Sequence, residues 1–313
     1  MVSAYIALYL FLAGTGGGAF LIGSFVDMAL RFCPRWEWGA RVSPATDAGL
    51  VLGPVLVAAS ALFLVLDLGV PEKALSLFLV STPSLISTGA WSIAAFCIVS
   101  AAALLLGVLA GDDGDLEGER LGGRVLLRVG EFACSVMATA LALVVIIYSG
   151  VFLSMYPSLP FLHTPLVPIL FVASALACGL AGLVLTAFFR QSEFSMQEAL
   201  ESLLLIDVVL VVVEATALAA FLVASCLSGG PSLGAVQLLT SGRLAMLFWI
   251  GVVVLGLVVP LSVDVVCRRT PAFAAFALGA GCTLVGGLCL RLSLLMATER
   301  FNLAFMSALG FWS

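Results

Sequence analysis

The stretch LFLAGTGGGAFLIG, residues 10–23, places five glycines inside an otherwise apolar run. Letter by letter, residues 14–19 match the G-x-G-x-x-G/A fingerprint of a dinucleotide-binding turn. That turn binds a pyrophosphate where a strand ends and a helix begins, whereas these glycines lie in the middle of the apolar run from Tyr5 to Leu30. About 20 apolar residues suffice to cross a bilayer. Because small residues four apart, such as Gly14 and Gly18, let another helix or a flat ligand approach closely, the stretch predicts a tightly packed transmembrane helix.

The composition indicates a polytopic membrane protein. Hydrophobic residues make up 63% of the chain and charged residues 10%, and the mean hydropathy is +1.24. Soluble domains average about 45–50% apolar and about 25% charged residues. The net charge of −5 and the single histidine argue against nucleic-acid binding, which needs a basic surface. No Lys or Arg precedes the first span, so we expect it to be retained rather than cleaved as a signal peptide.

Long apolar runs are separated by short polar segments or by segments with Gly and Pro. This pattern predicts an all-α protein with eight transmembrane helices in helix bundles. The predicted spans are 4–30, 48–68, 85–110, 125–152, 160–189, 200–227, 243–265 and 272–296. The loops are short, and the hydrophilic stretch GDDGDLEGERLGG (111–123) does not have the spacing of a calcium loop. We therefore expect a single integral membrane domain over residues 1–313, with any soluble chemistry supplied by a partner.

The distribution of Lys and Arg predicts the orientation. The loops after spans one, three, five and seven hold nine of them, and the opposite side holds four: Lys73, Arg243, Arg291 and Arg300. Since basic loops stay in the cytoplasm, we expect a multi-pass protein of the cytoplasmic (inner) membrane with both termini outside.

Carboxylates inside the spans are candidates for function, because ionisable groups are costly in a bilayer. In this orientation four of them fall in the cytoplasmic halves of their helices and Glu214 lies near the middle of the membrane. The four are Asp27, Glu131, Asp207 and Asp264. Together the five could form a hydrated proton path from the inside toward the centre. The alternative is that each is a structural partner of a serine, threonine or arginine.

A second set of polar residues gathers by depth on the outer side: Asp67, Tyr148, His163 and Arg291. The Tyr148 phenol could hydrogen-bond a quinone carbonyl, although tyrosine is also common at membrane interfaces without a chemical role. Arg291 could simply pair with Asp67. The single histidine lies in a loop, which argues against a membrane b-haem. The eight cysteines never form C-x-x-C, so they predict neither an iron–sulfur nor a zinc framework.

Five stretches, in order along nearly the whole chain, resemble the polysulfide reductase membrane-subunit family (NrfD/PsrC-like proteins). They are YLFLAGTGGGAFLIG (9–23), LDLGVPEKALSLFLVSTPSLISTGAWSIAAF (66–96), YSGVFLSMYPSLPFLHTPLVPILFVASALACG (148–179), FWIGVVVLGLVVPL (248–261) and GGLCLR (286–291). The resemblance implies a haem-free, quinone-binding membrane anchor subunit of a respiratory oxidoreductase complex, as in anaerobic respiration. Such a subunit exchanges electrons between membrane quinol and an iron–sulfur subunit.

By the same resemblance, menaquinone or ubiquinone is the cofactor, and the chain itself holds no haem or metal. A ferredoxin-like iron–sulfur subunit docks on the outer face and serves a molybdopterin-type or similar catalytic subunit, which carries the terminal catalytic site. The quinone pocket would contain Tyr148, Thr15, Gly17, Gly18 and Asp67, with the glycines thinning the first span beside it. The sequence departs from some relatives: the first span has no histidine, and Ser87-Thr88-Gly89 replaces serine-tryptophan-glycine.

Two other readings of the residues stay open. Midplane carboxylates and glycine-broken helices would also suit a secondary transporter or permease, although no inverted repeat relates residues 1–152 to 160–296. A purely structural anchor without a quinone site is the third reading.

Overall fold

The computed structural model of the protein describes residues 4–33, 35–67, 85–111, 121–155, 160–190, 193–269 and 272–308, and all regular elements in these ranges are helical. The elements are α1 (Ala4–Phe32), α2 (Glu37–Thr46), α3 (Gly49–Asp67), α5 (Leu85–Ala110), α6 (Leu121–Ser154), α7 (Leu166–Phe189), α8 (Glu193–Ser228), α9 (Gly230–Thr240), η1 (Leu247–Val258), α10 (Val259–Cys267) and α11 (Phe273–Ala308).

Eight segments of the described residues are long and apolar enough to cross a membrane, which confirms the predicted fold class and number of spans. They are Tyr5–Phe32, Gly39–Leu66, Ser87–Ala110, Gly123–Ser154, Leu166–Phe189, Ser202–Ser228, Leu247–Cys267 and Phe273–Thr298. The second begins earlier than predicted, because α2 runs almost directly into α3. The protein is therefore a multi-pass membrane protein.

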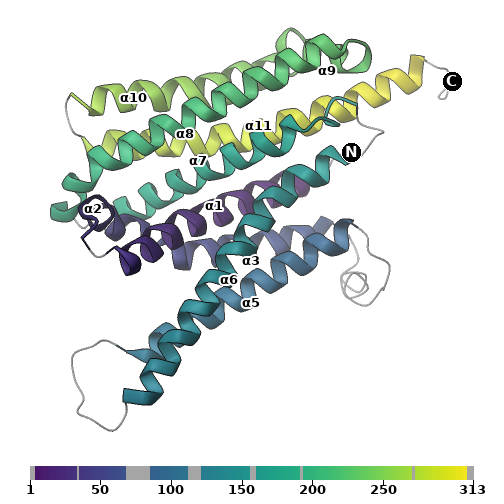
Figure 1. Ribbon diagram of the computed structural model, residues 1–313. Helices are drawn as coiled ribbons and strands as arrows, with labels where there is room; N and C mark the ends of the chain where they lie inside the picture. Colours follow the sequence, from purple (N-terminus) through teal and green to yellow (C-terminus); the bar gives the residue numbers. More distant parts are fainter. Residues whose placement is uncertain are drawn as a thin grey trace.

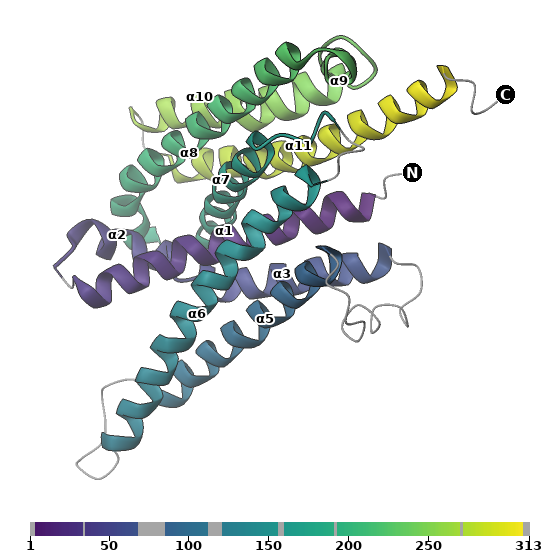
Figure 2. The same cartoon turned by 45° about the vertical axis from the view of Figure 1, so that its right-hand side comes forward.

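Two helices form the centre of the bundle. The most apolar windows of α1 and α7 are 67% and 72% buried, against 22–44% for the other six spans. In Figures 1 and 2, α8, α9 and α10 lie on one side of this pair, and α3, α5 and α6 lie on the other. α11 packs on α7, α10 and η1. The start of α1 and the end of α11 lie at the same end of the molecule (Figure 1).

The glycines of α1 face several neighbouring helices, which explains their number in residues 10–23. A Cβ at Gly16 would lie 2.8 Å from the Gly53 carbonyl oxygen of α3, and one at Gly17 would lie 2.8 Å from the Ile146 side chain of α6. A Cβ at Gly18 would collide with the backbone of Ala175 on α7. The glycines therefore let α1 be approached from three sides at once, as the central helix of a bundle requires.

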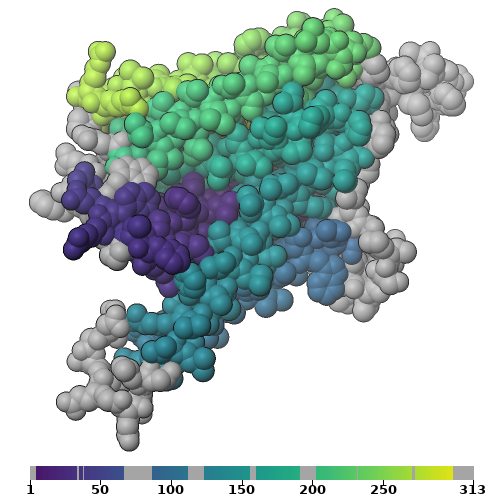
Figure 3. All heavy atoms as spheres, in the orientation of Figure 1, coloured from purple at the N-terminus to yellow at the C-terminus, as the bar shows by residue number. Residues whose placement is uncertain are grey.

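The outward faces of the bundle are apolar. Ile98, Val108 and Leu227 are 70%, 78% and 83% exposed, and many more large aliphatic side chains share this exposure. Soluble monomers rarely present so much contiguous apolar surface, whereas lipid tails solvate it without cost. Figure 3 shows α6 crossing the molecule diagonally, and the start of α6 extends with the end of α5 beyond the other helices (Figure 1). The surface thus matches a protein embedded in a bilayer.

The seventh span contains an unusual element. Its first twelve residues, η1, form a π-helix, and it continues as α10 from Val259. Pro260 lacks an N–H and therefore removes one helix hydrogen bond at this junction. Gly256 of η1 and Gly286 of α11 meet backbone to backbone. A π-helix is rare and usually short, and it changes which side chains face the neighbouring helix.

Candidate functional site

Two buried carboxyl groups face each other where α8 meets α10. Asp207 is 3% exposed and Asp264 is 1% exposed, and each influences the charge of the other. Neither oxygen of Asp264 has a hydrogen-bond partner among the described residues. Two like charges this close are strongly unfavourable in an apolar interior, and a proton shared between the groups relieves the repulsion. The pair can therefore hold and release a proton.

A third buried carboxyl group, that of Glu214, lies beyond the Asp207/Asp264 pair toward the centre of the bundle. It lies two helical turns beyond Asp207 on α8, is 6% exposed, and interacts electrostatically with that residue. Its carboxyl group also interacts with the Ser174 hydroxyl of α7 and with the charge of Arg291. The sequence prediction that Asp207 and Glu214 share a helix face agrees with this placement. Their role in proton transfer stays a prediction.

Arg291 is the largest fully buried side chain among the described residues, at 1% exposed. Its Nη1 donates to the Ser174 hydroxyl over 3.2 Å and to the Gly287 carbonyl over 2.8 Å. The guanidinium also lies 5.6 Å and 5.4 Å from the ring centres of Phe11 and Phe171. Such cation–π contacts stabilise a desolvated guanidinium. The side chain of Asp67, the partner that the sequence suggested, lies outside the described residues; the contacts of Arg291 with described residues lie on α1, α7 and α11.

The guanidinium of Arg291 reaches the glycine segment of α1. A Cβ at Gly14 would lie 2.8 Å from its Nη2, so a larger residue at this position would displace the side chain. Both Nε and Nη2 lack a hydrogen-bond partner among the described residues, and so does the hydroxyl of Thr15, which is 3% exposed. A line of buried polar groups thus runs from Asp264 across the bundle to α1, with unsatisfied atoms at both ends. Buried unsatisfied groups are costly and uncommon, and this is a place where water or a ligand would be stabilised.

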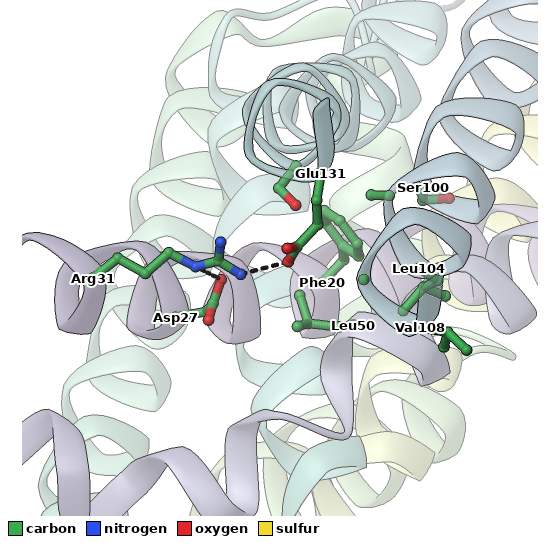
Figure 4. A pocket seen from close by; sticks show the side chains of 11 residues that line it. Phe20, Asp27, Arg31, Leu50, Ser100, Leu104, Val108 and Glu131 are labelled. Atoms are coloured by element: carbon green, nitrogen blue, oxygen red, sulfur yellow. Dashed lines mark hydrogen bonds and ion pairs between the residues drawn. The ribbon is translucent and has the colours of Figure 1, made fainter. Parts of the chain in front are cut away.

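The remaining two predicted carboxylates form a separate group between α1 and α6 (Figure 4). Arg31 donates from Nε to Asp27 over 2.9 Å and from Nη2 to Glu131 over 2.6 Å. The side chains are partly exposed: 36% for Arg31, 28% for Asp27 and 18% for Glu131. The five carboxylates therefore lie in two groups, α8/α10 and α1/α6, which the spacing of residues along the sequence could not reveal.

Tyr148 lies on α6 and packs on α5. A Cβ at Gly89 would collide with the Tyr148 ring, and the ring also packs on Phe152 with centroids 5.8 Å apart. The residue is half-buried, so packing holds the ring in place while part of the residue stays exposed. Gly89 belongs to Ser87-Thr88-Gly89, the segment in which the sequence departs from some relatives. Close packing on Gly89 therefore fixes the position of the Tyr148 ring, whose hydroxyl is the candidate hydrogen-bond donor to a quinone.

The other predicted quinone contacts lie in different surroundings. Thr15 is enclosed near Gly182 of α7, rather than beside Gly89. Gly17 and Gly18 contact α6 and α7 directly, so they set the distances between helices. The side chain of Asp67 lies outside the described residues. Among the described residues, no group of three or more His, Cys, Asp or Glu side chains could hold a metal ion.

Sequence reasoning missed Ser174 and the surroundings of Arg291 in the buried line. Ser174 carries no pattern signal in an apolar run. Arg291 was named among the polar residues of the outer side, and its contacts with α1 and α7 were not predicted. Its four-residue spacing from Gly287, whose carbonyl it binds, was the available signal for a residue that faces the bundle.

The fold and these sites define an integral membrane helix bundle with buried ionisable groups. The family model described as "Polysulphide reductase, NrfD" matches residues 2–302. The C subunit of the polysulfide reductase of Wolinella succinogenes is 30% identical over 314 residues, which cover 95% of this protein and 93% of the relative. Protein NrfD of Escherichia coli K12 is 29% identical over 308 residues, covering 94% and 93%. The protein belongs to the NrfD polysulphide reductase family.

Proposed function

We propose that this protein is the quinone-binding membrane subunit of a multi-subunit oxidoreductase. The observation that carries the proposal is the full-length similarity to the C subunit of a polysulfide reductase, a named component of a reductase. In this proposal the protein exchanges electrons between membrane quinol and an iron–sulfur subunit on its outer face. That partner in turn serves a molybdopterin-type or similar subunit, and both termini of the present protein lie on the outer side.

The residues at the outer end of α6 suit a quinone head. The Tyr148 phenol is positioned by Gly89 and Phe152 and can donate a hydrogen bond to a quinone oxygen. Asp67 is the second proposed polar contact, while Thr15, Gly17 and Gly18 act indirectly where α1 packs on α6 and α7. A bound quinol supplies two electrons, which pass to the partner, and two protons, which leave through the protein or at its surface.

The buried line from Arg291 to Asp264 is proposed as the route for protons between the centre and the cytoplasmic half. Glu214 and the carboxyl pair Asp207/Asp264 can exchange protons along it, and Arg291 supplies a fixed positive charge beside Glu214. Asp27 and Glu131 are proposed as a second proton-exchanging group nearer the surface. If the line conducts protons during turnover, quinol oxidation is coupled to charge movement across the membrane.

Tyr148→Phe tests the quinone site, because it deletes one hydroxyl and keeps the ring. A buried hydrogen bond contributes about 0.5–1.5 kcal/mol, and about 1.4 kcal/mol in a barrier is tenfold in rate. We expect roughly tenfold slower quinol oxidation, measured on the purified complex with a short-chain quinol and an artificial acceptor. Tyr9→Phe, a buried tyrosine of α1 outside the proposed contacts, is the matched control. An unchanged rate and affinity in Tyr148→Phe would make Tyr148 an interfacial aromatic and remove the proposed site.

A further inference from the structure

A cavity of about 230 Å³ lies between α1, α3, α5 and α6, beside the Asp27–Arg31–Glu131 group. Its walls are mostly apolar, with Phe20, Leu50 and Leu104 among the lining residues (Figure 4). The charged group occupies one end. A cavity with one polar end and apolar walls has the form of a site for an amphiphile.

The cavity is reached from the lipid side of the bundle. Val108 of its lining is 78% exposed, and Leu105 on the same helix is 60% exposed. Both residues belong to the lipid-facing surface of α5. The volume is below the roughly 300–1,000 Å³ of pockets that enclose a whole drug-sized ligand. It therefore suits a ring-sized head whose hydrocarbon tail stays in the bilayer.

The charges at the polar end of the cavity determine which kind of ligand head group can bind there. Two carboxylates meet one guanidinium, which gives the group a formal charge of −1, and Arg31 already uses Nε and Nη2 on those carboxylates. An anionic head would meet net repulsion. A carboxylate can accept about four hydrogen bonds, so Asp27 and Glu131 keep free acceptor positions. Hydroxyl groups that donate to them form charge-assisted bonds, which are roughly twice as strong as neutral ones.

We propose that this cavity is a second ligand site, for a neutral amphiphile with hydroxyl donors on a ring, the chemical class of a quinol. Asp27 and Glu131 accept from the hydroxyls, and Phe20 and Leu104 contact the ring. The site is distinct from the one at Tyr148: Glu131 and Tyr148 are seventeen residues apart on α6, about 25 Å at 1.5 Å per residue. The inference stands independently of the function proposed above.

Binding of 2-heptyl-4-hydroxyquinoline N-oxide, a fluorescent hydroxylated ring with an alkyl tail, tests the proposal. The purified full-length protein in nanodiscs is titrated, and fluorescence quenching gives the number of sites. Gly107→Leu fills the cavity, since a Cβ there meets only the Glu131 side chain, at 3.6 Å or more. We expect two sites per protein molecule in the wild type and one in Gly107→Leu. Gly281→Leu is the matched control, because a Cβ at Gly281 has no neighbour within 4 Å.

Further arms separate the possible outcomes. Glu131→Gln keeps the shape but removes the charged acceptor, and we expect about tenfold weaker binding at this site. If Gly107→Leu and Glu131→Gln both bind as the wild type does, the proposal is overturned. Displacement of the probe by cardiolipin in a salt-dependent manner would also overturn it, by making the cavity an anionic-lipid site. If the Tyr148 site does not exist, the wild type has one site and Gly107→Leu none, so the two proposals fail separately.

Discussion

Gly18 shows how one residue sets the spacing of the central helices. A Cβ here meets the backbone of Ala175, which cannot move aside as a flexible side chain can. Gly18→Ala should therefore lower thermal stability in detergent, by about 1–3 kcal/mol, the usual cost of overpacking. Gly281→Ala should instead raise stability by up to about 1 kcal/mol, because alanine is the better helix former and space is open. Equal melting temperatures for the two variants would contradict this account of α1.

Asp264 gives a second prediction at this scale. Asp264→Asn removes the like charge beside Asp207 and keeps the shape of the side chain. We expect stability equal to or above that of the wild type, together with loss of proton uptake during turnover. Proteoliposomes containing the complex and an internal pH-sensitive dye provide the measurement. The control is Glu37→Gln, an exposed carboxylate that is 85% solvent accessible. Wild-type proton uptake in Asp264→Asn would exclude the pair from the proton route.

The relative placement of two residues could be predicted from the sequence when both lie on one helix. It could not be predicted when they lie on different helices. The seven-residue spacing of Asp207 and Glu214 gave their common face, because helical periodicity is local. The partners of Arg291 lie on α1, α7 and α11, and residues 174 and 291 come together only through packing. For the same reason the sequence could not separate Asp27 and Glu131 from the α8/α10 carboxylates. The proton path stays a prediction, now divided between two groups of residues.

Among the elements, η1 has the most specific structural consequence. Because a π-helical turn is wider than an α-helical turn, Gly251 faces Cys289 of α11. A Cβ at Gly251 would lie 2.8 Å from the Cys289 sulfur. If the segment before Pro260 were an α-helix, Gly251 would face another direction, because the rotation around the helix axis per residue differs between the α-helix and the π-helix. The register of the seventh span against α11 therefore depends on the π-helix.

Cross-linking tests that register. Gly251→Cys should form a disulfide with Cys289 on mild oxidation, after a small shift that relieves the close approach, and peptide mass spectrometry would detect it. Gly281→Cys, where a Cβ has no neighbour within 4 Å, is the control that should not cross-link to Cys289. Failure of Gly251→Cys to react would indicate an ordinary α-helix in this span.

The existence and order of the helices were predictable, whereas the π-helix was not. Each span needs only an apolar run of sufficient length, a property of the sequence alone. The change from α to π geometry depends on how Gly256 and Gly286 meet, which is a contact between two spans. The early start of the second span at Gly39 also depends on packing, since α2 lies against α1 and α8 and is amphipathic rather than apolar.

At the scale of the whole molecule, the buried position of Arg291 changes the charge count that sets orientation. Residues in the interior do not contribute to a loop, so the outer side keeps three basic residues, Lys73, Arg243 and Arg300, against nine on the other side. Since cytoplasmic loops hold the excess of Lys and Arg, this correction strengthens the predicted orientation. With eight spans, both termini must lie on the same side, which agrees with the arrangement in Figure 1.

Reporter fusions provide the test of this orientation. A periplasm-active reporter fused after Ser313 should be active, and the same reporter fused after Arg190, in the loop after the fifth span, should be inactive. A cytoplasm-active reporter should give the opposite pattern at both positions. The outcome decides which face each site serves: Tyr148 then lies toward the outside, and the carboxyl pair Asp207/Asp264 toward the cytoplasm. A reversed pattern would place the proposed iron–sulfur partner on the cytoplasmic side and the Asp27–Arg31–Glu131 group outside.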